Sequence, residues 1–406
     1  MITLDERTKR ILLIVGLSVA VIGIGIALWF VFFKKEASVI ISEEERAGLP
    51  ESGSLPTRKE AAERAAARGA VALPVSRIAA GGITETDVLN ISGTVAPTIG
   101  ADGKSAAFLN ANDGRYYRIG PDGRVVQMSD KQFFNVEKVH WTPDKNKTIM
   151  EFPDGSNVYF DFNQQKQVTL PKHWQDFNFS KTGGDMAALS MGNSPENRWL
   201  ITSNPDGSGA SAIEALGNNA DKVTVSYSPN NQTIAFSETG EPPGGERQSV
   251  LLVGKNGENL PALIVDGGGF QPNWAPSGKQ LLYSTYHSSD DWKPRIYIAN
   301  GQGDAVGTGK KDIGLNTWAE KCTFADDTTL FCAVPDSLDE GAGLAPETAK
   351  FVPDTIYKID TSTGAKSIVG KPTGNFSISN LSVDSDSANL IFTDQTTGAL
   401  HKMRLR

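Results

Sequence analysis

Cysteine is almost absent from this chain, with two residues among 406. A small disulfide scaffold needs a denser set of cysteines, and a zinc site of four thiolates needs four, so both are excluded. Clustered basic charge is also lacking, because 39 Lys and Arg residues stand against 47 Asp and Glu, a net charge of −8. Nucleic-acid binding depends on basic residues that neutralise phosphates, so the composition argues against that function.

Long apolar runs are lacking too, with one exception at residues 11–33 (ILLIVGLSVAVIGIGIALWFVFF). At about 1.5 Å per residue this uncharged run is long enough to span a bilayer core of about 30 Å. The alternative is a cleaved signal peptide, but the run exceeds the usual apolar core of such peptides and no small-x-small site precedes Lys34. We therefore expect an uncleaved transmembrane helix at 11–33, after a short tail at 1–10.

The flanks of this run decide its orientation only weakly, because basic residues are almost equally frequent on both sides. We expect the N-terminus inside and the large domain outside the plasma membrane. Residues 34–71 have few large apolar side chains and predict a polar, partly helical linker. Within it, residues 57–68 (TRKEAAERAAAR) contain strong helix formers, with Thr57 and Glu60 as a capping box.

A two-part pattern recurs from about residue 72 with a period of about 40–50 residues. One half is a hairpin of two apolar strands, as in 225–236 (VSYSPNNQTIAF) and 272–283 (PNWAPSGKQLLY). The other half is a second hairpin with Gly, Asn or Asp at the turn, as in 356–369 (IYKIDTSTGAKSIV). Four short antiparallel strands per repeat predict an all-β fold, a β-propeller over residues 72–406.

The repeats are counted by their first hairpins, which start near residues 96, 138, 176, 223, 272, 319 and 378. These starts predict seven blades, but second hairpins number only six, because the last repeat ends after three strands. The missing strand can come from 72–78 or from 88–91, which would close the ring with both chain ends. Six blades with one irregular repeat is the alternative.

The repeat residues carry a family resemblance. The pattern aromatic-Ser-Pro-Asn/Asp-x-x-x-Ile-Ala-Phe, followed by Ile-Tyr-x-x-Asn-x-x-Gly, resembles the TolB-type propeller repeat, a relative of WD-type repeats. It covers roughly 95–406, although the first copy has Gly100-Ala101-Asp102 in place of Ser-Pro. The resemblance implies an extracytoplasmic bacterial protein that uses its propeller as an interaction platform. The chain departs from TolB in its predicted anchor and in lacking an obvious α/β domain before the propeller.

The two cysteines flank a predicted hairpin turn. Cys322 and Cys332 each lie five residues from Asp327, so a symmetric hairpin places them directly opposite each other. Opposed strand residues lie about 4.5–5.5 Å apart at Cα, within disulfide range, and disulfides persist outside the cytosol. We expect a bridge. Two buried free cysteines are the alternative, and a slip of one residue in register would separate the thiols.

Catalytic and metal-binding motifs are sparse. The Gly-x-Ser-x-Gly element of propeller hydrolases does not occur. Residues 303–311 (GDAVGTGKK) imitate a phosphate loop but predict a hairpin turn, and Asp384-x-Asp386 lacks the Gly and Glu of a calcium loop. The four histidines are His140, His173, His287 and His401, and we expect His140 in the core. None of them has a second metal ligand at helical spacing, so the sequence contains no zinc motif. We predict no catalytic residues, no metal and no cofactor.

The connection between second and third strands is long in three successive repeats, at 238–248, 287–294 and 335–354. These connections emerge on one face of a propeller, and long loops on a rigid scaffold often bind partners. Tolerated insertions without a role are the alternative. Trp292 is the candidate anchor for a partner, and we expect four charged residues of these loops around it in the fold: Asp290, Asp291, Arg247 and Arg295.

The resulting hypothesis is a membrane-anchored, extracytoplasmic β-propeller that acts as a non-enzymatic binding platform. Its partners would be the lipid bilayer, through residues 11–33, and an envelope protein or cell-wall polymer. The alternative is a propeller enzyme (a lyase, lactonase or glycan hydrolase) with its site at the central channel. A cytosol-facing scaffold is a third possibility.

Overall fold

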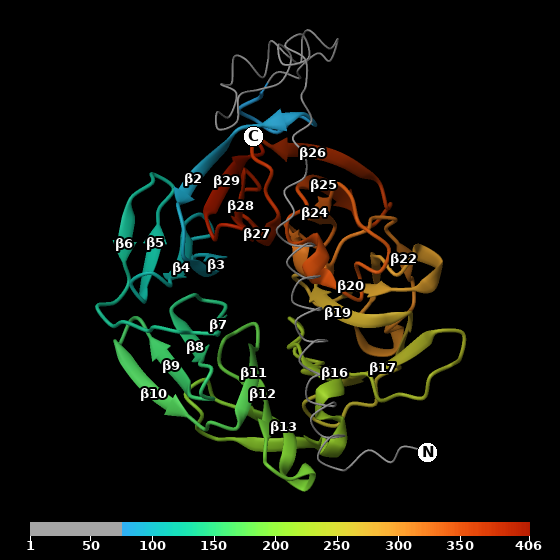
Figure 1. Cartoon of the computed structure of the whole chain (residues 1–406). Helices are drawn as coiled ribbons and strands as arrows, with labels where there is room; N and C mark the ends of the chain where they lie inside the picture. Colours follow the sequence, from blue (N-terminus) through green and yellow to red (C-terminus); the bar gives the residue numbers. More distant parts are fainter. Residues whose placement is uncertain (1–74) are drawn as a thin grey trace, which may run out of the picture. The chain divides into compact units, whose positions relative to one another are not determined.

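The computed structural model describes residues 75–406, which form seven sheets, antiparallel except for one added strand, in a ring around a central axis (Figure 1). This confirms the predicted seven-bladed β-propeller, and the six-bladed alternative is wrong. The expected transmembrane helix at 11–33 and the linker at 34–71 lie outside the described residues. Within residues 75–406, no helix has the length and apolar character required to cross a membrane.

The first four blades follow one another along the chain. Their strands, from the channel outward, are β3 (Thr94–Ile99), β4 (Ala106–Asn110), β5 (Arg115–Ile119) and β6 (Val125–Gln127); β7 (Lys138–Trp141), β8 (Lys147–Glu151), β9 (Asn157–Asp161) and β10 (Lys166–Leu170); β11 (Trp174–Phe179), β12 (Met186–Met191), β13 (Arg198–Ser203) and β14 (Ser211–Ala215); β15 (Val223–Val225), β16 (Ala235–Ser237), β17 (Arg247–Val253) and β18 (Leu263–Asp266).

The last three blades differ in how their outer edges are made. Their strands in the same order are β19 (Gly268–Trp274), β20 (Gln280–Tyr286), β21 (Pro294–Asn300) and β22 (Lys311–Asp312); β23 (Cys322–Phe324), β24 (Thr329–Pro335), β25 (Asp354–Asp360), β26 (Lys366–Pro372) and β1 (Ile83–Thr84); β27 (Ile378–Val383), β28 (Asn389–Asp394), β29 (Leu400–Arg404) and β2 (Thr86–Asn90).

The N-terminal strands β1 and β2 close the ring. Strand β2 pairs antiparallel with β29 and supplies the missing outer strand of blade 7, close to the second of the two predicted segments. Strand β1 pairs parallel with β26 and gives blade 6 a fifth strand, which the sequence pattern did not predict. The backbone N–H groups of Ala79 and Gly81 donate to Arg404 and Val369, so this segment fastens blade 6 to blade 7.

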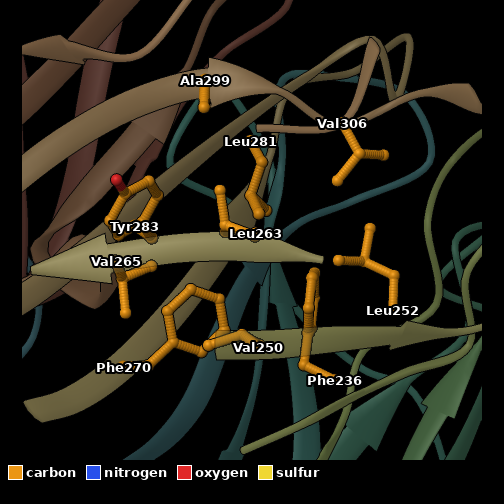
Figure 2. Packing of buried hydrophobic residues seen from close by; sticks show 10 residues of the cluster. All are labelled: Phe236, Val250, Leu252, Leu263, Val265, Phe270, Leu281, Tyr283, Ala299 and Val306. Atoms are coloured by element: carbon orange, nitrogen blue, oxygen red, sulfur yellow. The ribbon is translucent and has the colours of Figure 1, made fainter. Parts of the chain in front are cut away.

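The core lies between neighbouring blades. Figure 2 shows Phe236, Val250 and Val265 of blade 4 packed against Phe270 and Tyr283 of blade 5. Second strands are covered on both faces, as in β4, where Ala106 to Leu109 are at most 2% exposed. Such strands therefore have continuous apolar runs, whereas simple alternation would be expected if only one face were buried.

The predicted disulfide joins Cys322 to Cys332. The two residues are direct partners in the β23–β24 ladder, and their Cα atoms lie 4.0 Å apart. Both are buried, at 4% and 0% exposure. The hairpin symmetry predicted from the sequence is therefore confirmed.

The innermost strands alternate between two forms around the ring. Strands β3, β11, β19 and β27, in blades 1, 3, 5 and 7, each carry a register shift, whereas β7, β15 and β23 do not. Each shift contains a residue with positive φ: Ala96, Asp176, Gly269 and Asn380. A bulge of this kind re-aims side chains, and two of these residues, Asp176 and Asn380, belong to polar sites between blades.

Candidate functional site

One face of the propeller carries the connections between second and third strands, together with the connections that enter each blade; we call it the loop face. The three long loops predicted from the sequence lie here, at residues 238–246, 287–293 and 336–353. They belong to blades 4, 5 and 6 and are therefore neighbours in the ring.

Direct contacts join these three loops into one continuous surface. The Ser288 hydroxyl donates to Glu246 Oε2 at 2.7 Å, and His287 Nε2 lies 3.3 Å from the same oxygen. Further along, the N–H of Gly343 donates to the Trp292 carbonyl at 2.8 Å. A side chain at Gly343 would place its Cβ 2.4 Å from that of Tyr286, so the close approach of the two loops requires glycine.

Four of the five predicted partner-binding residues lie in the middle loop or beside it. Trp292 is half-buried with φ +55°, and its ring centroid lies 6.3 Å from that of Tyr286. The Arg295 guanidinium bonds Asp290 Oδ1 at 2.7 Å and both oxygens of Asp312 at 2.8–2.9 Å from Nε. Exposed Asp291 pairs with Lys293. These charges are largely engaged within the protein.

The electrostatics of Arg295 fit a supporting role in the loop. The hydrogen bonds that it donates to the Asp312 carboxylate raise the pKa of the guanidinium above its ordinary value. Burial works to raise the pKa of Asp312, but the bonds from Arg295, the N–H of Gly314 and the nearby positive charges together outweigh it and hold that pKa below its ordinary value. This pair fixes the base of the 287–293 loop and leaves little free charge for a partner.

The fifth predicted residue, Arg247, is not part of this cluster. Its guanidinium is exposed and donates to the carbonyls of Gly244 (3.0 Å) and Pro243 (3.3 Å) in its own loop. The neighbouring Glu246, which the sequence pattern did not single out, makes the contact with the middle loop instead.

Two exposed apolar side chains on the longest loop were missed from the sequence. Leu344 is 58% exposed and Phe351 is 74% exposed, whereas the other large apolar residues of this loop, Leu338 and Val352, are partly buried. Large apolar side chains left in water on a built surface often mark a contact site. The single Phe of the loop is the sequence signal that could have found Phe351.

A recess of about 190 Å³ opens beside this loop. Blades 6 and 7 and the connection that enters blade 6 line it: Trp318, Glu320, Lys321, Pro346, Ala349, Ile378, Ser379, Asn380 and Gln395. Its wall contains a buried ion pair, in which Lys321 Nζ lies 2.8 Å from both oxygens of Asp354.

Asp354 also connects two blades. One of its oxygens accepts a hydrogen bond from the backbone N–H of Ile378 at 2.6 Å, so a carboxylate of blade 6 holds the first strand of blade 7. Burial raises the pKa of Asp354, although Lys321 and this N–H act in the opposite direction. We call this arrangement the 6/7 seam.

A second polar seam lies between blades 2 and 3. His140 Nε2 lies 2.6 Å from Glu151 Oε1, and Lys138 Nζ lies 2.6 Å from Asp176 Oδ1. The other Glu151 oxygen is 3.4 Å from the backbone nitrogen of Asp176. His140 was expected in the core, and it is partly buried against Phe177, but its ring is paired with a carboxylate. We call this the 2/3 seam.

The remaining motifs have structural roles. Residues 303–311 form a one-turn 3-10 helix and a turn in the outer hairpin of blade 5, as expected. Asp384 Oδ1 accepts from the N–H groups of Ala388 and Asn389 in a turn, also as expected. Over residues 75–406, no group of three or more His, Cys, Asp or Glu side chains could hold a metal ion.

These features define a seven-bladed β-propeller whose loop face is raised over three blades. No family model and no curated protein matches the chain. Solved structures match its fold. An oligogalacturonate lyase in complex with manganese is 14% identical at a TM-score of 0.52, over 75% of this chain and 87% of that one. An oligogalacturonate lyase from Vibrio parahaemolyticus is 12% identical at 0.52, over 79% and 92%.

A third structural match is a propeller domain of a different protein. The Cps50 (Swd1) β-propeller domain of Myceliophteria thermophila is 10% identical at a TM-score of 0.52, over 79% of this chain and all of that domain. At these identities the likeness shows the fold alone, because propellers of the same architecture carry unrelated activities.

Proposed function

We propose that this protein is a membrane-tethered, extracytoplasmic propeller of the TolB type that binds an envelope protein or cell-wall partner through its loop face, without catalysis. The observation that carries the proposal is the continuous surface made by the three long loops, with exposed Leu344 and Phe351 on it. Binding surfaces of this kind combine apolar anchors with a polar surround.

One further observation supports the proposal. The Cys322–Cys332 bridge fits an oxidising compartment, since disulfides are rare in the cytosol.

The binding surface is tested with a matched pair of variants of the full-length protein. L344S/F351S removes the two exposed apolar side chains of the loop face, whereas V125S/V126S removes two of similar exposure (58% and 59%) from the outer strand of blade 1. Capture of the partner from solubilised envelopes should fall at least tenfold for the first variant only. Equal capture by both variants would contradict the proposal. If W292A captures the partner as well as the wild-type protein does, Trp292 is not part of the binding surface.

The compartment is tested by the state of the cysteines. Because Cys322 and Cys332 are buried, thiol labelling must follow denaturation of protein taken rapidly from cells. A bulky maleimide should label neither cysteine before reduction and both afterwards. Labelling of both without reductant would favour the cytosol-facing scaffold.

A second candidate function is a propeller enzyme with its site at the 2/3 seam. The observation that favours it is a histidine oriented by a carboxylate, with Lys138 and Asp176 beside it. Two structural neighbours are oligogalacturonate lyases by name, so oligogalacturonate and other uronate oligosaccharides are the substrates to try. Turnover that is abolished in H140A would establish this alternative and overturn the non-enzymatic proposal.

A further inference from the structure

The recess at the 6/7 seam contains one carboxylate that the protein does not neutralise. Lys321 is fully engaged with both oxygens of Asp354, so this pair contributes no net charge. Glu320 lines the same recess and makes no hydrogen bond or ion pair with any residue in 75–406. The remaining polar lining is neutral, from Ser379, Asn380 and Gln395. The recess therefore carries a net charge of about −1.

Glu320 is open to a ligand. Its side chain is exposed in the recess, and no residue of 75–406 neutralises its carboxylate. The protein around it raises the pKa of the carboxyl, and the opposing effect of Lys321 does not cancel this. A cation bound beside the carboxylate would supply the missing counter-charge, so the site is suited to a positive group.

The size and lining of the recess further restrict which positive groups could bind there. Its volume of about 190 Å³ lies below the roughly 300–1,000 Å³ typical of small-molecule sites, so it fits one long side chain. Trp318 contributes an aromatic wall, and Lys321 Nζ lies 6.0 Å from its ring centroid. The exposed amide of Asn380 offers an oxygen acceptor, beside the Gln395 oxygen that also accepts from the Ser377 hydroxyl. Guanidinium is planar, weakly hydrated and rich in donors, and it suits this lining better than ammonium does.

The rim of the recess is continuous with the proposed binding surface. Pro346 and Ala349 line the recess, and they belong to the same loop as exposed Leu344 and Phe351. A partner segment lying on this loop would place a side chain over the opening. Arginine beside apolar contacts is a frequent composition of the energetic centre of protein interfaces.

We propose that the recess between Glu320 and Asn380 is an arginine pocket, which receives one arginine side chain of a protein partner bound to the loop face. This inference rests on the proposed function and names its partner chemistry. Glu320 supplies the charge, the neutral amides accept hydrogen bonds from the guanidinium, and the Lys321–Asp354 pair keeps the wall in place.

The pocket is tested without the partner, using N-acetyl-arginine amide and its citrulline counterpart as probes. Titrations of the full-length protein in detergent micelles, followed by saturation-transfer NMR, should show binding of the arginine probe and at least tenfold weaker binding of citrulline. E320Q should weaken arginine binding at least tenfold. E347Q, on the same loop but outside the lining, should leave it unchanged.

A charge-restoring variant separates loss of the pocket from loss of the charge. Asn380 has a positive φ that Asp tolerates nearly as well, so N380D in the E320Q background should recover at least half of the lost affinity. Binding should also fall as the pH drops and Glu320 becomes protonated. Absence of arginine binding, equal binding of citrulline, or full affinity in E320Q would overturn the pocket while leaving the loop-face proposal standing.

Discussion

Between blades 2 and 3 a carboxylate meets a histidine, and between blades 6 and 7 a carboxylate meets a lysine. In both seams the carboxylate also reaches the backbone nitrogen of the next blade's first strand, at 3.4 Å from Glu151 and 2.6 Å from Asp354. The two seams thus share one device for joining blades. They differ in the side chain that meets the carboxylate, an imidazole or an ammonium, and in how deeply the carboxylate is buried.

The difference shows how one joint can be structural and another available for binding. The Lys321–Asp354 pair is 8% and 0% exposed at the side chains, so it is permanent and closed. Because Lys321 pairs with Asp354, the neighbouring Glu320 has no partner among residues 75–406, and it lines a recess. At the 2/3 seam, His140 and Glu151 are more exposed, at 21% and 11%, and Glu151 and Asp176 each already have a side-chain partner.

The largest expected effect is loss of the buried lysine. K321M leaves Asp354 buried without a counter-charge, which should lower the free energy of unfolding by about 3–5 kcal/mol. Urea denaturation of the full-length protein measures this, with K358M on an exposed position of β25 as the control. A loss below about 1 kcal/mol would show that the 6/7 seam does not depend on the pair.

Removal of the disulfide tests whether the bridge or the ion pair holds blade 6. The bridge closes a short loop with a sequence separation of 10, so C322A/C332A should cost about 2–3 kcal/mol. The same denaturation experiment applies, and the value should add to that of K321M only in part, because Lys321 and Cys322 are adjacent. A cost above that of K321M would show that the bridge, and not the ion pair, is the stronger of the two.

The 2/3 seam should respond less strongly. H140A removes the bond to Glu151, whose side chain is 11% exposed against 0% for Asp354, so we expect a loss of about 1.5–3 kcal/mol, the range for hydrogen bonds to charged groups. Comparison with K321M in one denaturation series is the measurement. If H140A costs more than K321M, the view of the 6/7 seam as the closed joint is wrong.

The smallest effect concerns pH and His401, which is 5% exposed and lies between Phe376 and Phe392. Neither ring nitrogen has a hydrogen-bond partner within residues 75–406, and burial lowers the pKa of the ring, although Asp394 acts in the opposite direction. The unfolded chain therefore binds the proton more readily than the folded one, and stability should fall as the pH drops below about 6.5.

The control for this pH dependence is a variant pair. H401L should flatten the unfolding free energy between pH 7 and pH 5, whereas H173Q, at an exposed histidine, should leave the wild-type slope intact. A slope that persists in H401L would assign the acid sensitivity to another group.

The sequence was informative where a local pattern decides the structure. The turn residues and apolar strands predicted seven blades, and the equal spacing of Cys322 and Cys332 around Asp327 predicted their bridge. Predictions from single residues were less complete. Arg247 was expected near Trp292 in the fold, yet its side chain donates hydrogen bonds to carbonyls of its own loop.

The polar seams could not be predicted, because their members come from different blades or from distant parts of one blade. Asp354 meets Lys321 across 33 residues and His140 meets Glu151 across 11. Only the packed ring brings these groups together. Asp176 and Asn380 occupy bulge positions with positive φ, and because these positions are not glycine, the sequence does not indicate the bulges. The fifth strand of blade 6 was missed for a similar reason, since β1 is only two residues long.

Site-specific photo-crosslinking in living cells tests the central claim most directly. A photoreactive amino acid at position 351 of the full-length protein, on the loop face, is compared with one at position 126, on the outer strand of blade 1. We expect one discrete covalent adduct from position 351, reduced by E320Q, and none from position 126. An adduct from position 126 alone, or from neither position, would contradict binding through the loop face.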